Sequence, residues 1–191
     1  MNVWYPEIPL RRLPALVAIT AMGALFAGLY GAIHDQISYS ISQEYFTKLK
    51  FYQFAYANFG WPPRLFAAEV GFLATWWVGL IGGWLLARIG LATLWTGGKP
   101  ACILRAFALA AAIAVTVGAL GVLVAAIRIK LQGVDPWEEW QTALRLRDPQ
   151  DFVIVAYLHA ASYLGGLLRL LCAAVYVRKK RCDLVGGLPN S

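Results

Sequence analysis

The chain has 191 residues, of which 60% are hydrophobic and 14% are charged. Soluble domains carry about 45–50% apolar and about 25% charged residues, so the composition excludes an ordinary soluble domain and indicates a membrane protein. The net charge is +7, and the basic residues stand beside apolar segments. We therefore attribute the charge to membrane topology and to anionic lipid headgroups of the bilayer, and we expect no nucleic acid partner.

The first long apolar segment covers residues 13–33 and contains no charged residue. It is long enough to cross a bilayer as a helix, and it is longer than the apolar core of a cleaved signal peptide. Gly23, Ala27 and Gly31 recur at every fourth position, a spacing that allows another helix to approach closely. We therefore expect a retained transmembrane helix that packs against a neighbour.

A polar stretch, residues 34–42, follows, and it leads into a stretch that is crowded with aromatic residues up to Trp61. Ser40 and Gln43 fit a capping box, which predicts a helix over residues 41–59. This helix is too polar to span the membrane, and aromatic rings favour the depth of the lipid headgroups. We expect an interfacial helix that lies on the bilayer.

Three further apolar segments have the length of a membrane span: residues 66–87, 106–127 and 152–177. The last of them follows Asp148-Pro149, a helix start signal. A second interfacial helix is predicted over residues 136–147, with Asp135 as its N-cap. The sequence thus predicts an all-α integral membrane protein, a single membrane domain over residues 1–191, with four transmembrane helices and two amphipathic interfacial helices on the outer side.

Four spans place both termini on the same side of the membrane. The terminal segments and the middle connection carry nine Lys and Arg residues, against seven in the other two connections. Because cytoplasmic loops are enriched in basic residues, we expect both termini in the cytoplasm.

Four ionisable residues stand near the outer ends of the predicted spans: His34, Asp35, Glu69 and His159. Ionisable groups at membrane depth are costly and usually face the interior of a bundle. Two imidazoles and two carboxylates can bind a divalent transition metal, carry protons, or hold a quinone headgroup by hydrogen bonds. Helical spacing also places a polar face on the last span, made of His159, Ser162, Tyr163, Gly166 and Arg169.

A purely structural interpretation of these residues stands beside the functional one. His34 and Asp35 lie at the predicted water boundary, Glu69 can pair with Arg64, and His159 can bond a neighbouring helix. No HxxxH, HExxH or ExxH pattern supports a metal site, and no GxSxG, P-loop or dinucleotide-binding fingerprint indicates an enzyme. The sequence therefore favours a protein without catalytic activity.

The segment YGAIHDQISYSISQEYFTKLKF, residues 30–51, resembles a stretch that recurs in uncharacterised bacterial multi-spanning membrane proteins. That stretch reads roughly YG-apolar-HDQ-x-[ST]-Y-x-ISPEYFTKFKF, and Gln43 stands where it has proline. The resemblance implies a protein of the bacterial cytoplasmic (inner) membrane and transfers no activity. It draws attention to Gln36, Tyr39 and Glu44 as further polar candidates.

Three functions remain open at this point. We favour a non-catalytic bundle whose outer segments contact a protein partner, a second copy of the chain, or the membrane surface. The alternative is an outer site for a transition metal, a quinone or protons, built from His34, Asp35, Glu69 and His159, with Tyr39 or Tyr163 nearby. The third is a small transporter, which would have to form an oligomer because four spans are few.

Overall fold

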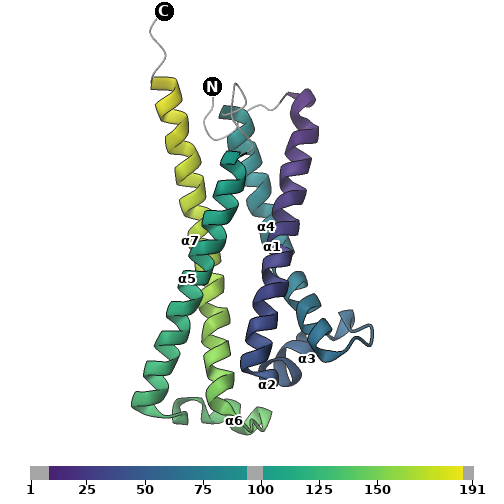
Figure 1. Ribbon diagram of the computed structural model, residues 1–191, viewed down its shortest axis with the longest axis vertical. Coiled ribbons are helices and arrows are strands. Elements are labelled where there is room, and N and C mark those ends of the chain that lie inside the picture. The colour runs from purple at the N-terminus through teal and green to yellow at the C-terminus, as the bar shows by residue number, and fades with distance from the viewer. Residues whose placement is uncertain (1–8, 94–100, 187–191) are drawn as a thin grey trace, which may run out of the picture.

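The computed structural model of the protein describes residues 9–93 and 101–186; side chains are left out for residues 89–93, for most of residues 101–107, and for most residues from 167 onward. The described part is helical and contains no strand. Its long helices are α1 (Leu13–Ile41), α4 (Pro63–Thr93), α5 (Ala101–Gln132) and α7 (Pro149–Gly186). Figure 1 shows them as an elongated bundle in which α1 begins and α7 ends at the same end.

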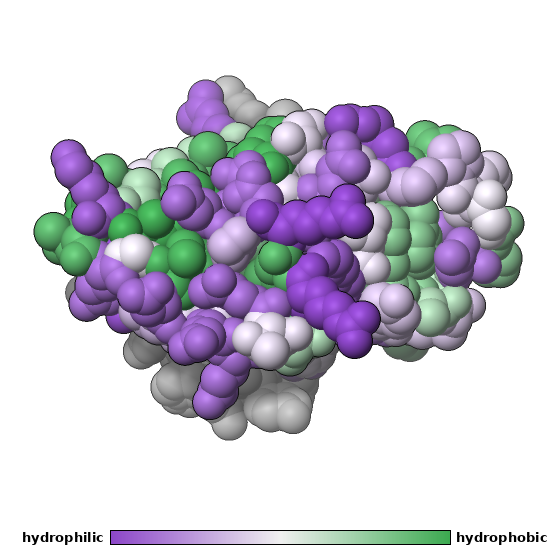
Figure 2. All heavy atoms as spheres, turned by 90° about the horizontal axis from the view of Figure 1, so that it is seen from below, coloured by the Kyte–Doolittle hydropathy of each residue, from purple (hydrophilic) through white to green (hydrophobic). Residues whose placement is uncertain are grey.

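Short elements gather at the opposite end of the bundle, which we call the α6 end (Figure 1). They are α2 (Gln43–Tyr45), the π-helical turn η2 (Phe46–Lys50), α3 (Phe51–Gln53), the 3₁₀ turns η3 (Ala55–Ala57) and η4 (Asp135–Trp137), and α6 (Glu138–Leu144). Figure 2 shows this end face-on, with hydrophilic side chains across its middle and hydrophobic side chains beside them.

Among the described residues, three helical segments are long and apolar enough to cross a membrane: Leu10–Ile41, Pro63–Arg88 and Ala108–Gln132. The predicted class, an all-helical protein with membrane-spanning helices, is confirmed to this extent. The fourth predicted span, residues 152–177, lies within α7, and many of its side chains lie outside the described part. It stays a prediction.

Helices α1 and α4 are in backbone contact along the predicted stripe of small residues. A Cβ atom added to Gly31 would lie 2.1 Å from the carbonyl oxygen of Gly71 and 2.2 Å from the hydroxyl of Thr75. The same Thr75 hydroxyl donates a hydrogen bond to the carbonyl of Ala27 across the interface, at 2.7 Å. The close helix approach predicted from the spacing of Gly23, Ala27 and Gly31 is thereby confirmed.

Helices α5 and α7 form the second pair. A Cβ atom on Gly121 would lie 2.4 Å from the Cβ of Ala161, and one on Gly118 would lie 2.8 Å from the Ser162 hydroxyl. Most tertiary contacts of α1 are with α4, and most of those of α5 are with α7. The bundle therefore consists of two tight helix pairs that meet each other over a smaller area.

The polar stretch after residue 33 differs from the prediction, because α1 continues through it to Ile41. The helix is interrupted at Ser42, whose backbone is extended and whose hydroxyl accepts a hydrogen bond from the Tyr45 N–H at 3.3 Å. The predicted cap, Ser40, is instead inside α1, where its hydroxyl donates to the carbonyl of Gln36. Burial of Asp35 and Ser38 against the rest of the bundle keeps this stretch helical.

The predicted interfacial helix over residues 41–59 is not one helix but the succession α2, η2, α3 and η3. Its first aromatic residues, Tyr45 and Phe46, turn inward. They form a core cluster with Tyr39, Ala67, Phe152 and Val155. Its later aromatic residues, Tyr52, Tyr56 and Phe59, are more than three-quarters exposed. The segment thus closes the α6 end of the bundle with one face and exposes the other.

The predicted helix over residues 136–147 is shorter than expected. It consists of η4 and α6, ends at Leu144, and is followed by Arg145 in the left-handed region with φ 49°. Asp135 makes no side-chain cap. The start signal at Asp148-Pro149 is confirmed, since α7 begins at Pro149 and the Asp148 carboxylate accepts from the Asp151 N–H at 3.4 Å.

Candidate functional site

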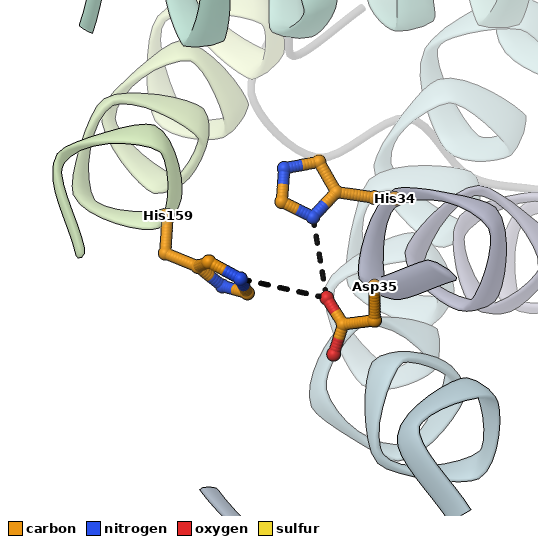
Figure 3. A group of neighbouring side chains, drawn as sticks. All are labelled: His34, Asp35 and His159. Carbon is orange, nitrogen blue, oxygen red and sulfur yellow. Dashed lines mark hydrogen bonds and ion pairs between the residues drawn. The ribbon is translucent and has the colours of Figure 1, made fainter. Parts of the chain in front are cut away.

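Three of the four ionisable residues singled out in the sequence converge near the α6 end of the bundle. His34 and His159 both point toward the Asp35 carboxylate, as Figure 3 shows. His34 Nδ1 lies 3.2 Å and His159 Nε2 lies 3.7 Å from Asp35 Oδ1. One donor atom from each of the three residues lies within 4.8 Å of the others. Asp35 and His159 are both buried.

The spacing of residues on α1 explains how the neighbours His34 and Asp35 serve different partners. Asp35 continues the four-residue spacing of Gly23, Ala27 and Gly31, so it faces α4, where a Cβ on Gly71 would lie 2.9 Å from Asp35 Cβ. His34 is rotated from it by about 100° around the helix axis, which turns its imidazole toward α7. The site therefore stands where the tight α1/α4 pair meets the second pair.

Two serines extend the cluster into a hydrogen-bonded chain. His34 Nε2 lies 3.1 Å from the hydroxyl of Ser162, and His159 Nε2 lies 3.2 Å from that of Ser38. The Ser38 hydroxyl also lies 3.0 Å from the His34 carbonyl, to which it donates. The chain runs from Ser162 through His34, Asp35 and His159 to Ser38 and joins α1 to α7. Sequence reasoning did not select Ser38, although it follows His34 by one helical turn.

Aromatic rings seal the cluster from the α6 end. The Tyr45 ring lies 4.8 Å from the His159 ring, centroid to centroid, and Phe46 lies 6.1 Å from it. Phe46 is fully buried. Burial raises the pKa of the Tyr45 phenol, and the neighbouring Tyr163 and Asp35 raise it further. Tyr45 is therefore a neutral, packed ring over the imidazole.

A cavity of about 880 Å³ begins at the cluster and is lined by His34, Asp35 and His159. Many of its other lining residues are apolar, and its further polar groups include Lys50, Gln53, Thr75, Ser162 and Tyr163. The Lys50 ammonium donates a hydrogen bond to the Tyr163 hydroxyl at 3.1 Å. The residues His159, Ser162, Tyr163 and Gly166 line the cavity together, as the helical spacing of α7 predicted.

Glu69 does not join the three clustered donors. Its Oε2 atom is buried and has no hydrogen-bond partner among the described residues. The side chain of Arg169, on the predicted polar face of α7, lies outside the described residues.

Gln36 and Tyr39 fasten α1 to the start of α4. The Gln36 side-chain amide donates to the carbonyl of Arg64 at 2.8 Å. The Arg64 guanidinium lies 5.3 Å from the centroid of the buried Tyr39 ring. The contacts of Gln36 and Tyr39 between α1 and α4 therefore give both residues a structural role.

Glu44 binds the backbone at the start of α7. Its Oε2 accepts hydrogen bonds from the N–H groups of Arg147 and Asp148, at 2.9 and 2.8 Å, and its other oxygen pairs with Lys48. Lys48 in turn donates to the carbonyl of Arg145. Partial burial of Glu44 raises its pKa, but the bonds from Lys48, Asp148 and Arg147 outweigh this and leave the pKa below its usual value. We call this group of contacts the Glu44 clamp.

No family model, curated protein or solved structure matches the chain. The resemblance of residues 30–51 to bacterial multi-spanning proteins therefore stays a prediction, and the function has to be argued from the site itself.

Proposed function

We propose that the protein is a multi-pass membrane protein that binds a divalent transition metal through His34, Asp35 and His159. The observation that supports this is the convergence of these donors from two helices, within 4.8 Å of one another, with Asp35 and His159 buried. Two imidazoles and one carboxylate form a ligand set that suits zinc, iron and related metals. Buried ionisable groups at such a depth are functional candidates by default.

The spacing of the donors is close to what one ion requires. Imidazole nitrogen and carboxylate oxygen bind zinc at about 2.0–2.2 Å, so two ligands of a tetrahedral ion lie about 3.4 Å apart. His34 Nδ1 and Asp35 Oδ1 lie 3.2 Å apart, and His159 Nε2 lies 3.7 Å from the same oxygen. Small side-chain adjustments complete the set. Three protein ligands leave a position for a further ligand on the side of the cavity.

The serine hydroxyls allow each imidazole to carry its proton on either ring nitrogen, as metal binding would require. A hydroxyl both donates and accepts, so Ser162 can stabilise His34 with its proton on either ring nitrogen. With a metal on Nδ1, the His34 Nε2–H donates to Ser162, which is the usual second-shell support of a metal-bound histidine. His159 Nε2 contacts the Ser38 hydroxyl, and a metal on this nitrogen would take the place of that contact, with the imidazole proton on Nδ1.

The membrane arrangement that accompanies this proposal has four spans, with α7 as the fourth, and both termini in the cytoplasm of a bacterial cell. Its support is the bundle itself, in which α1 begins and α7 ends at the same end (Figure 1). The excess of basic residues on that side, nine against seven, agrees with this orientation. The metal site then lies toward the outer face of the cytoplasmic membrane.

The test is the metal content of the detergent-purified protein, measured by elemental mass spectrometry, beside the double variant His34→Ala/His159→Ala. We expect one transition metal per chain in the wild type and none in the double variant. Glu69→Gln is the matched control, because it removes a buried carboxylate that stands outside the cluster, and it should keep the metal. A wild type that stays free of metal after incubation with zinc, iron, cobalt and copper would refute the proposal.

A second candidate function is contact with a protein partner or a second copy through the α6 end. The observation that favours it is the exposure of Tyr52, Tyr56 and Phe59, at 76%, 77% and 76%. Aromatic residues are enriched in interfaces, although headgroup contact explains them as well. A photo-crosslinking amino acid at Phe59 tests this: a discrete protein adduct supports a partner, and lipid adducts alone contradict it.

A further inference from the structure

The cavity beside the three donors lies between the two helix pairs. Its walls come from α4, with Leu73, Trp77 and Ile81, and from α1, α5 and α7, while residues 50–56 close it toward the α6 end. The cavity is therefore a crevice that runs from the cluster along the length of the bundle.

The side of this crevice opens toward the lipid. Trp76, Trp77 and Ile81 line it and are also 38%, 51% and 46% exposed on the surface of the bundle. All three lie inside the membrane-spanning segment Pro63–Arg88, away from its ends. A ligand that enters here must be dissolved in the bilayer. The depth of these tryptophans, which an aromatic belt does not explain, follows from their position at this opening.

Lys50 provides a positive charge inside the crevice. Its side chain is buried, at 8% exposure, and its ammonium bonds the Tyr163 hydroxyl but forms no ion pair with a carboxylate in the described part of the chain. Lys48, two residues earlier, is paired with Glu44. A buried cation is costly when no anion is in contact with it, so the Lys50 ammonium can accept an anionic group as a contact partner.

Asp35 lines the same crevice and its charge acts on Lys50 through space, but its carboxylate is in contact with His34 and His159 and not with the ammonium (Figure 3). The Tyr163 hydroxyl accepts the bond from Lys50, so its own hydrogen is left to donate to a ligand. Lys50 and Tyr163 together offer a cation and a hydroxyl donor in a crevice whose α4 wall, with Leu73, Trp77 and Ile81, is mostly apolar.

We infer that the crevice binds a long-chain fatty acid, whose carboxylate bonds to Lys50 and Tyr163 and whose hydrocarbon chain lies along Leu73, Trp77 and Ile81. The volume of about 880 Å³ lies in the range of small-ligand sites, about 300–1,000 Å³. The inference goes beyond the metal proposal and does not depend on it, since neither Lys50 nor Tyr163 is one of the three clustered donors.

The experiment uses the full chain in zwitterionic phosphatidylcholine vesicles and measures quenching of tryptophan fluorescence by stearate brominated at mid-chain. The pH is set so that the fatty acid is ionised. We expect saturable quenching that unbrominated stearate reverses, because Trp76 and Trp77 stand beside the chain. Treatment with a chelator should leave the result unchanged, which separates it from the outcome of the metal test.

Variants identify the residues responsible. Lys50→Gln should weaken binding by about ten- to a hundredfold, the effect of losing one hydrogen bond to a charged group. Lys50→Arg keeps the charge and should retain most of the affinity, and Lys130→Gln, which changes an exposed lysine of α5, should bind as the wild type. Should Lys50→Gln fail to fold, Tyr163→Phe, which removes the hydroxyl of a half-exposed ring, must weaken binding severalfold.

Three results would overturn the inference. The first is equal binding by wild type and Lys50→Gln, or by wild type and Tyr163→Phe where that variant is used. The second is equally tight binding of brominated methyl stearate, which carries no charge. The third is quenching that stearate cannot reverse but a quinone analogue can. This result would show that the crevice binds an uncharged ring compound.

Discussion

The contacts within each helix pair differ in kind from the contacts between the pairs. Within the α1/α4 pair, glycines bring the two backbones together, and within α5/α7 the glycines Gly118, Gly121 and Gly165 each lie against side chains of the partner helix. Between the pairs the contacts include polar ones: His34 with Ser162, His159 with Ser38, and the Glu44 clamp. Close packing of small residues thus dominates within the pairs, with hydrogen bonds such as Thr75 to Ala27 and Arg128 to Tyr157 beside it, whereas side-chain hydrogen bonds fix the mutual position of the pairs.

This difference explains where a site can exist in so small a bundle. Close-packed helices leave no space between them, and small residues in contact offer no ligands. The junction between the pairs is less tightly filled and carries polar side chains, so both the clustered donors and the cavity stand there. The following changes test the distinction, in order of decreasing effect on free energy.

The largest effect is expected from Gly31→Ala within the α1/α4 pair. The new methyl group would overlap the Gly71 carbonyl and the Thr75 hydroxyl, which only a shift of the helices can relieve. Overpacking typically costs about 1–3 kcal/mol, and we expect the upper end here because backbone atoms are in the way. Unfolding of the purified protein by added sodium dodecyl sulfate measures the loss.

Gly166→Ala is the matched control, since a Cβ at this helical position meets nothing within 4 Å. Removing glycine from a helix is favourable by about 0.5–1 kcal/mol, so this variant should be as stable as the wild type or more so. Equal stability losses in the two variants would contradict the close α1/α4 packing.

Glu44→Ala tests the junction between the pairs. It removes the acceptor of two backbone N–H groups at the start of α7 and the partner of Lys48, and we expect a loss of about 1–3 kcal/mol in the same unfolding assay. Glu138→Ala, at an exposed position of α6, should leave stability unchanged.

The Glu44 clamp should also depend on pH. The folded protein lowers the pKa of Glu44 below its usual value of 4.5, so the stabilisation is complete above that pH and is lost as the pH falls through the lower, folded value. Glu44→Gln should therefore lose less stability than the wild type on acidification. If the stability of the two proteins fell equally as the pH is lowered, the charge of Glu44 would not contribute to the stability of the clamp.

Ser162→Ala probes the site rather than the scaffold. Loss of a second-shell partner of a metal-bound histidine typically lowers metal affinity about 10–100-fold, and we expect the lower end because water can replace the hydroxyl. Competition with a chromogenic chelator measures the affinity. An unchanged affinity would mean that His34 does not bind the metal through Nδ1.

The smallest effect is expected from Arg64→Gln, which removes the guanidinium beside the Tyr39 ring. Exposed cation–π contacts contribute about 0.5–1 kcal/mol, so the unfolding assay should show a small loss. A loss as large as that of Glu44→Ala would show that the end of α1 is held by Arg64 more than by the clamp.

Features that depend on local spacing could be predicted from the sequence. The stripe of Gly23, Ala27 and Gly31 and the shared face of His159 and Ser162 follow from helical periodicity, and both agree with the structure. His34, Asp35 and His159 could be chosen because ionisable residues are rare in apolar segments.

Features that depend on distant partners could not be predicted. Glu44 binds backbone groups more than a hundred positions away, and no local pattern marks a residue for that role. The break at Ser42 replaces the expected start at Ser40, because burial of Asp35 and Ser38 favours a continued helix over a local cap. Lys50 belongs to the stretch that was expected to lie on the bilayer, but it is buried and bonds Tyr163 of α7, 113 positions away, which no local pattern indicates.

The position of His159 on the last long helix has a consequence for biosynthesis. Translation delivers α1 and α4 first, so the glycine-packed pair can form while the ribosome is still making the second half. During that interval Asp35 has His34 beside it but lacks His159, and Glu44 lacks the N–H groups that precede α7. The cluster of His34, Asp35 and His159 is therefore completed only when α7 has been made, and a chain that stops before α7 lacks the third donor.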